Sequence, residues 1–84
     1  MSRYELIWAE HAAEQFDTLS AAARQAVLTV ITEIQRDPLG RGTYDKTADR
    51  YAADINHEGI SGLIVYIVGD RHLRIVVLRV TVLK

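Results

Sequence analysis

Residues 61–83 decide the fold; they read SGLIVYIVGDRHLRIVVLRVTVL. Two apolar runs rich in β-branched residues flank the turn-forming Gly69-Asp70-Arg71-His72, a composition typical of two consecutive strands. Upstream, the run Tyr51–Asn56 has the same character and is joined to them by His57-Glu58-Gly59. Because short turns join consecutive strands, an antiparallel meander is predicted over Tyr51–Asn56, Ser61–Val68 and Leu73–Leu83.

The first half of the chain predicts one strand and two helices. Tyr4–Ala9 alternates with a period near two, which indicates a strand. Helical spacing follows in two segments, the first from Glu10 to Leu19 and the second over Ala21–Arg36. Ser20 is the expected N-cap of the second helix, and Asp37-Pro38 ends it. Leu39–Arg50 is expected to be one long loop.

These elements give the order strand, helix, helix, strand, strand, strand. We predict an α+β domain over residues 1–84, in which a two-helix hairpin packs on one face of a four-stranded, mainly antiparallel sheet. The first strand is expected beside the last, since the meander alone would cover the helices poorly.

Composition limits the possible functions. The formal net charge is −1, without the positive excess usual in proteins that hold phosphates. There is no cysteine, and the spacing of His11, His57 and His72 fits no metal motif, so we expect no metal and no cofactor. The three histidines are expected to be exposed. The N-terminus has no secretory pattern and the apolar runs are short, so a cytoplasmic protein without membrane contact is expected.

Both faces of the predicted sheet are apolar. In the last strand, one face is expected to carry Arg74, Val76, Leu78, Val80 and Val82, and the other Ile75, Val77, Arg79, Thr81 and Leu83. Helices on one side leave the second apolar face uncovered, and such a patch usually marks an interface. The predicted interface residues are Leu63, Val65, Ile67, Ile75 and Val77.

Basic side chains are the remaining candidates for contact with nucleic acid or a partner: Arg41, Lys46, Arg50, Arg71, Arg74 and Arg79. For the loop residues the alternative is a solvated surface. Arg79 stands in the middle of an apolar strand, where a charge should pair with an acid. The alternatives for it are contact with an antitoxin or a second copy of the chain, a merely exposed edge, and a catalytic role. Tyr44 and Tyr51 flank the basic loop and are candidates for stacking on a base, whereas Trp8 and Phe16 are expected in the core.

The ordered set of segments resembles the RelE/ParE superfamily of bacterial toxins. The resemblance rests on Tyr4-Glu5-Leu6-Ile7-Trp8, the helix end Ile34-Gln35-Arg36-Asp37-Pro38-Leu39, Leu63-Ile64-Val65-Tyr66-Ile67 and Ile75-Val76-Val77-Leu78-Arg79-Val80. It implies a toxin of a type II toxin–antitoxin system, neutralised by a cognate antitoxin, with the first strand parallel to a neighbour. RelE-like members cut messenger RNA on the ribosome, and ParE-like members poison DNA gyrase.

The sequence departs from the nucleases of that family. Where the family strand carries an arginine three residues before its tyrosine, this chain has Leu63. The basic cluster expected at the last strand is reduced to Lys84. The resemblance therefore predicts a RelE-like toxin with a degenerate ribonuclease site, in which Arg79 is the only candidate catalytic cation. The alternatives are a ParE-like toxin that binds gyrase and a non-catalytic dimeric binding protein.

Overall fold

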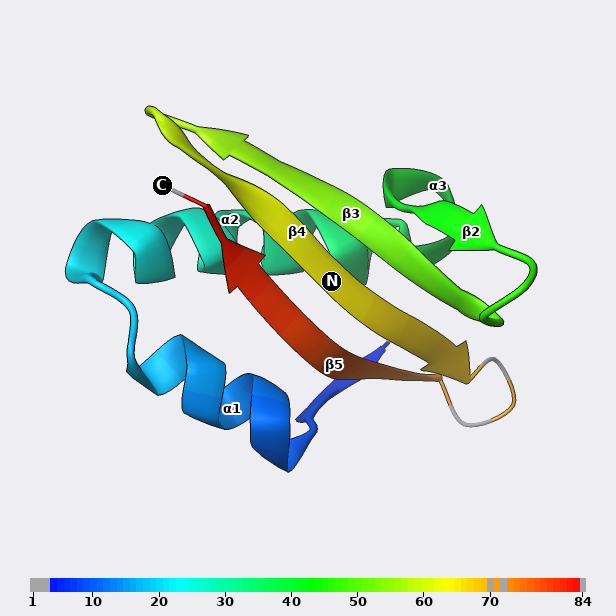
Figure 1. The fold of residues 1–84 in the computed structure, drawn as a ribbon. Helices are drawn as coiled ribbons and strands as arrows, with labels where there is room; N and C mark the ends of the chain where they lie inside the picture. Colours follow the sequence, from blue (N-terminus) through cyan, green and yellow to red (C-terminus); the bar gives the residue numbers. More distant parts are fainter. Residues whose placement is uncertain (1–3, 70, 72, 84) are drawn as a thin grey trace.

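The computed structural model describes residues 4–69, 71 and 73–83 of the chain. Its elements are β1 (Glu5–Trp8), α1 (Glu10–Asp17), α2 (Ala21–Arg36), α3 (Pro38–Arg41), β2 (Thr43–Asp45), β3 (Arg50–His57), β4 (Ile60–Gly69) and β5 (Arg74–Val82). The strands form one sheet in the order β1-β5-β4-β3-β2, with α2 along one face (Figure 1). Strand β1 pairs with β5 in parallel and all other pairs are antiparallel, as predicted.

The ends of helix α2 follow the local sequence. The Ser20 hydroxyl accepts a hydrogen bond from the amide of Ala23 at 3.2 Å, which satisfies a free donor of the first turn. The helix ends at Arg36, before Asp37-Pro38. Asp37 then caps α3 by accepting from the amide of Gly40 at 3.1 Å, with Pro38 in the first turn.

The segment Leu39–Arg50 is more ordered than predicted. It contains the end of α3 and the strand β2, so the sheet has five strands instead of the four expected. Strand β2 exists because it pairs with β3, where Thr43 lies opposite Ala52 and Asp45 opposite Arg50. A three-residue strand is too short to show periodicity, which is why the sequence did not reveal it.

The core lies between α2 and the sheet. Helix α2 contributes Ala23, Ala26, Val27, Val30, Ile31 and Ile34, and the sheet contributes Ala53, Ile55, Ile64, Tyr66, Ile75, Val77 and Val80. Trp8 and Phe16 pack against this core with ring centroids 5.1 Å apart. Both aromatic residues therefore have the structural place expected for them.

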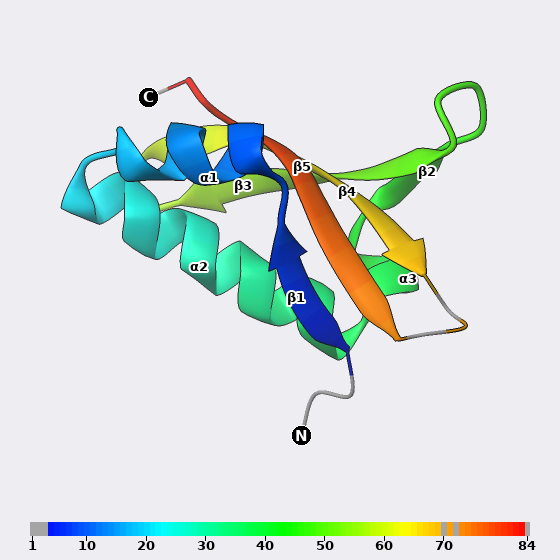
Figure 2. The ribbon, with the colours of Figure 1, turned by 90° about the horizontal axis from the view of Figure 1, so that it is seen from below.

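Helix α1 covers the edge of the sheet where β1 ends. Figure 2 shows α1 beside β5, further along that strand than β1. The side-chain oxygen of Gln15 accepts a hydrogen bond from the amide of Val80 at 2.8 Å. The second turn of α1 is thereby held close to the C-terminal part of β5.

A buried tyrosine joins the sheet to the segment after α2. Tyr66 is fully buried, and its hydroxyl donates to the carbonyl of Pro38 at 2.7 Å. Gly42 lies against the same hydroxyl, and a Cβ there would meet the ring carbon Cζ at 3.0 Å. Burial raises the pKa of Tyr66 to about 12, because the phenolate would lose hydration.

This shift predicts a loss of stability at high pH. The pKa of Tyr66 in the folded state lies above the unfolded value of 10.0. The contribution of the neutral Tyr66 phenol to the stability of the fold is therefore complete below pH 10 and is lost as the pH rises towards 12. Relative to Tyr66→Phe, the free energy of unfolding of the wild type should fall by about 2 kcal/mol over that window. At neutral pH, Tyr66→Phe itself should cost about 1 kcal/mol for the lost hydrogen bond. Urea denaturation of both proteins at pH 8, 10, 11 and 12 measures this; a constant difference between them would contradict it.

Candidate functional site

A β-bulge in β5 sets the direction of its side chains. Tyr66 lies opposite Val77 and Val65 lies opposite Arg79, so Leu78 is an extra residue in β5. An inserted residue breaks the alternation of faces along a strand. Val77 and Val80, three positions apart, therefore both face α2.

The bulge makes part of the predicted interface wrong. Ile75 and Val77 are 0% exposed and belong to the core beneath α2, not to the second face. Val76 lies on the second face instead, because it is opposite Ile67. Val80 is buried in the core together with Ile75 and Val77. The face away from α2, called the open face below, carries Leu63, Val65, Ile67, Val76, Leu78 and Arg79.

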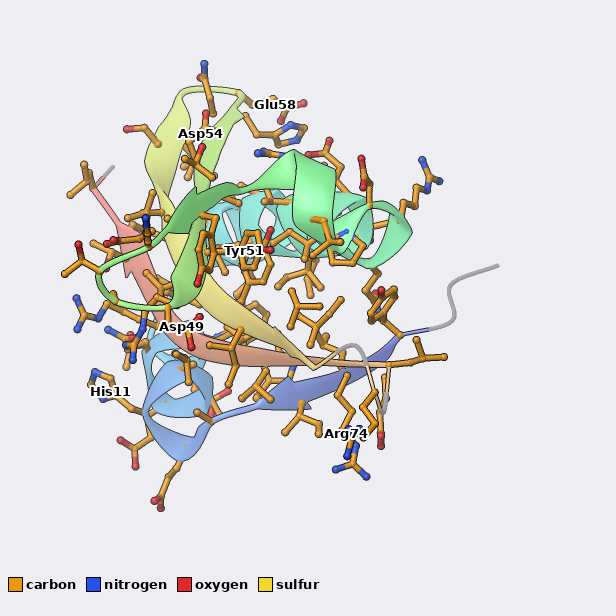
Figure 3. The ribbon with its side chains drawn as sticks, turned by 90° about the vertical axis from the view of Figure 1, so that its right-hand side faces the viewer. His11, Asp49, Tyr51, Asp54, Glu58 and Arg74 are labelled. Atoms are coloured by element: carbon orange, nitrogen blue, oxygen red, sulfur yellow. The ribbon has the colours of Figure 1, made fainter. Side chains whose placement is uncertain are left out.

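Three basic side chains meet on this open face. A hollow of about 290 Å³ is lined by His11 from α1, Arg50 from β3, Val65 from β4, and Leu78 and Arg79 from β5. We call it the cationic hollow. Figure 3 shows His11 on the same side of the sheet as the β2–β3 hairpin, which carries Asp49. Val65 separates the two arginines, because its strand lies between β3 and β5.

The arginines of the cationic hollow were candidates from the sequence, but their meeting was not predictable from it. Arg79 lies on the open face beside Val65, as expected, although its neighbour there from β5 is Leu78 instead of Ile75 and Val77. His11 was expected to be merely exposed, and Leu78 was assigned to the other face. Only the bulge and the position of α1 beside β5 bring these residues together.

Arg79 makes fewer interactions than Arg50, the other arginine of the hollow. It is exposed, and it makes no hydrogen bond or ion pair within residues 4–69, 71 and 73–83. Arg50 is also exposed, and its Nε donates to the carbonyl of Ala48 at 3.2 Å. Both guanidinium groups lie beside apolar side chains and are accessible to an anion.

The other predicted cations lie outside the hollow. Arg41 is the most constrained: its Nε is 2.8 Å from Glu33, and it also contacts the carboxylate of Asp54 at 3.3 Å and its carbonyl at 2.7 Å. The hydrogen bond to Glu33, followed by that to Asp54, raises the pKa of Arg41 although burial opposes the change. Arg41 therefore links α2, α3 and β3. Arg74 pairs with Glu5 at 3.3 Å.

Lys46 and Arg71 are exposed in the turns after β2 and β4. His57, which is partly buried, lies 3.9 Å from the carboxylate of Glu58. His72 and Lys84 lie outside the described residues.

The tyrosines proposed for base stacking pack on one another. The ring centroids of Tyr44 and Tyr51 are 5.1 Å apart, and those of Tyr51 and Tyr66 are 5.4 Å apart. Register places this row on the face toward the helices, opposite the cationic hollow, and Figure 3 shows Tyr51 pointing that way. The hydroxyl of Tyr44 donates to Asp49, a bond that raises the pKa of Tyr44. Base stacking by Tyr44 stays a prediction.

The position of Leu63 is poorly suited to bind a phosphate. Leu63 is 41% exposed on the open face, opposite Asp54 in β3 and Thr81 in β5. The apolar side chain offers no charge for a phosphate, and the only charged residue opposite it, Asp54, is an acid that pairs with Arg41. Within the described residues, no group of three His, Asp or Glu side chains is arranged to hold a metal ion. No helix among them is long and apolar enough to span a membrane.

Comparison with known proteins gives a match in structure only. No protein-family model matches the sequence, and neither does any curated protein. The fold is that of solved RelE toxins. A substituted Escherichia coli toxin RelE in the free state superimposes with a TM-score of 0.78 and 21% identity, covering 96% of this chain and 83% of that one.

Two complexes extend this likeness. The toxin–antitoxin complex RelBE2 of Mycobacterium tuberculosis contains a chain with a TM-score of 0.75 and 21% identity, covering 93% of this chain and 95% of that one. The archaeal RelE–RelB complex of Pyrococcus horikoshii gives 0.63 and 14% identity, with coverage of 96% and 94%. The likeness thus extends over almost the whole chain, and it establishes the fold.

Proposed function

We propose that this chain is the toxin of a type II toxin–antitoxin pair and is neutralised by a cognate antitoxin. The proposal is supported by the RelE fold, which covers 93–96% of the chain in the neighbours above. The open face adds a second reason, because exposed or half-buried Leu63, Val65 and Ile67 lie together on it. A contiguous apolar face of this kind is typical of a surface that a partner covers. A second copy of this chain is the other candidate for that partner.

Expression in bacteria tests the proposal. Induced alone, the chain is expected to arrest growth, and co-expression of the reading frame beside its gene should restore growth and yield a complex on purification. Translation and supercoiling assays on the arrested cells then separate a ribosomal target from DNA gyrase. Unimpaired growth, combined with a self-associated protein and no complex, would favour the non-catalytic dimeric protein instead.

We further propose that the chain is a poor ribonuclease. In the RelE-like reaction a ribose 2′-hydroxyl attacks the adjacent phosphate, and cations stabilise the charge that develops there. Here the position of the family arginine is Leu63, with Asp54 opposite it. Loss of one preorganised donor typically lowers the rate by about 10²–10³-fold.

Messenger RNA cleavage, mapped by primer extension after induction, measures this for the wild type, Arg79→Ala and Leu63→Arg. The wild type should cleave at least about 100-fold less than an active RelE toxin in the same host, and Leu63→Arg should regain part of the activity. Arg79 shares the open face with Leu63. It lies in the neighbouring strand β5, opposite Val65, which is the next residue of β4 on that face after Leu63. Strong wild-type cleavage that disappears in Arg79→Ala would refute the proposal and identify Arg79 as the catalytic cation. Silence in all three proteins would favour gyrase binding.

A further inference from the structure

The cationic hollow has basic but no acidic residues in its described lining, although Asp45 of β2 lies opposite Arg50 by register. Its lining, as far as the structure describes it, comprises His11, Arg50 and Arg79 above the apolar side chains of Val65 and Leu78, and contains no acidic residue. The basic groups come from α1, β3 and β5, which are distant in sequence. Two arginines, whose guanidinium groups can each pair with a carboxylate, line the hollow on either side of a half-buried valine.

The rest of the open face is not suited to a polyanion. By register, the strand residues on this face outside the lining of the hollow include one cation, Arg74, which pairs with Glu5, and two further acids, Asp45 and Asp54. A nucleic-acid backbone presents a charge at every nucleotide, so beyond the hollow it would meet carboxylates. A ligand with a single acidic group avoids this repulsion.

The surface beside the hollow indicates what else the ligand carries. Leu63, Val65 and Ile67 of β4 lie beside Val76 and Leu78 of β5, and together they form an apolar strip that runs to the edge of the hollow. Such a strip fits the apolar side chains of a peptide segment. One anion next to several apolar groups is the pattern of an amphipathic segment with an acidic residue.

We propose that the cationic hollow binds a carboxylate of the antitoxin, and that the adjoining apolar strip binds the apolar side chains of the same segment. This inference rests on the proposed function and specifies its partner surface. Arg79 and Arg50 pair with the carboxylate, and Leu78 and Val65 exclude water from the contact. The bulge at Leu78 is essential to this arrangement, since it places Arg79 on the face that carries Val65.

The test uses the full chain co-purified with the antitoxin encoded beside it, and measures the dissociation constant for variants of the chain. Arg79→Ala and Arg50→Ala should each raise it about 30-fold or more, because a desolvated charge pair loses one partner. Arg74→Ala is the matched control, since Arg74 lies on the same face but is paired with Glu5 outside the hollow; its effect should stay below about threefold. Thermal unfolding of each free variant checks that its fold is retained.

A charge swap makes the assignment specific. Arg79→Glu should abolish the complex, and replacing one acidic residue of the antitoxin by arginine should restore it. Equal dissociation constants for wild type, Arg79→Ala and Arg50→Ala would overturn the inference while leaving the toxin proposal intact. If Arg79→Ala and Arg50→Ala lost the binding of a single-stranded RNA hexamer that the wild type shows, and their antitoxin binding were unchanged, the hollow would be assigned to nucleic acid. If wild type neither arrests growth nor binds the neighbouring gene product, both proposals fail.

Discussion

Val77→Asp is expected to leave the chain unfolded at pH 7, whereas Val65→Asp should fold normally. Val77 is 0% exposed beneath α2, and none of the core residues around it is charged, so an introduced carboxylate would have no counter-ion there. The expected cost is about 4 kcal/mol or more, comparable with the entire stability of a small domain. Val65 lies on the open face and is only partly buried, so its substitution should cost less than about 1 kcal/mol.

Far-ultraviolet circular dichroism and urea denaturation of the two variants measure this contrast. Val65→Asp also places a carboxylate beside Arg50 and Arg79, so it should weaken the binding of any acidic partner in the cationic hollow. A folded Val77→Asp, or an unfolded Val65→Asp, would show that the faces of β4 and β5 are assigned the wrong way round.

Gly62→Ala is expected to destabilise the sheet strongly, although the same change at Gly69 in the same strand should not. A Cβ on Gly62 would clash with the backbone carbonyl of Thr81 and lie 3.0 Å from the Cα of Val82. Backbone atoms of a paired strand cannot turn aside as a side chain can, so β4 and β5 would have to separate locally. The expected loss is about 3 kcal/mol in the free energy of unfolding.

Gly69 provides the matched control. The nearest atom to a Cβ there is the Arg74 carbonyl oxygen at 3.8 Å, an ordinary contact distance. Alanine at this position should be neutral or stabilising by about 0.5 kcal/mol, because glycine loses more conformational freedom on folding. Urea midpoints of both variants decide the matter, and similar values for the two would contradict this account of Gly62.

The sequence predicted those features that depend on local patterns. The helical spacing of Ala21–Arg36, the Ser20 cap and the Asp37-Pro38 stop located α2 to the residue. The three closing strands were identified by their β-branched runs and short turns. The order of these elements was sufficient to indicate the RelE fold, because each is specified by residues only a few positions apart.

Tertiary structure decided the rest. Strand β2 forms only because β3 lies beside it, so the predicted sheet lacked one strand. The bulge at Leu78 depends on how β5 pairs with β4, and alternation read along the chain therefore assigned Ile75 and Val77 to the wrong face. The cationic hollow needs three elements, with His11 held beside β5 by the bond from Val80 to Gln15. The periodicity of a sequence depends only on residues that are close together along the chain. Strand register and the contacts between residues distant in sequence depend on how the helices and strands pack against one another.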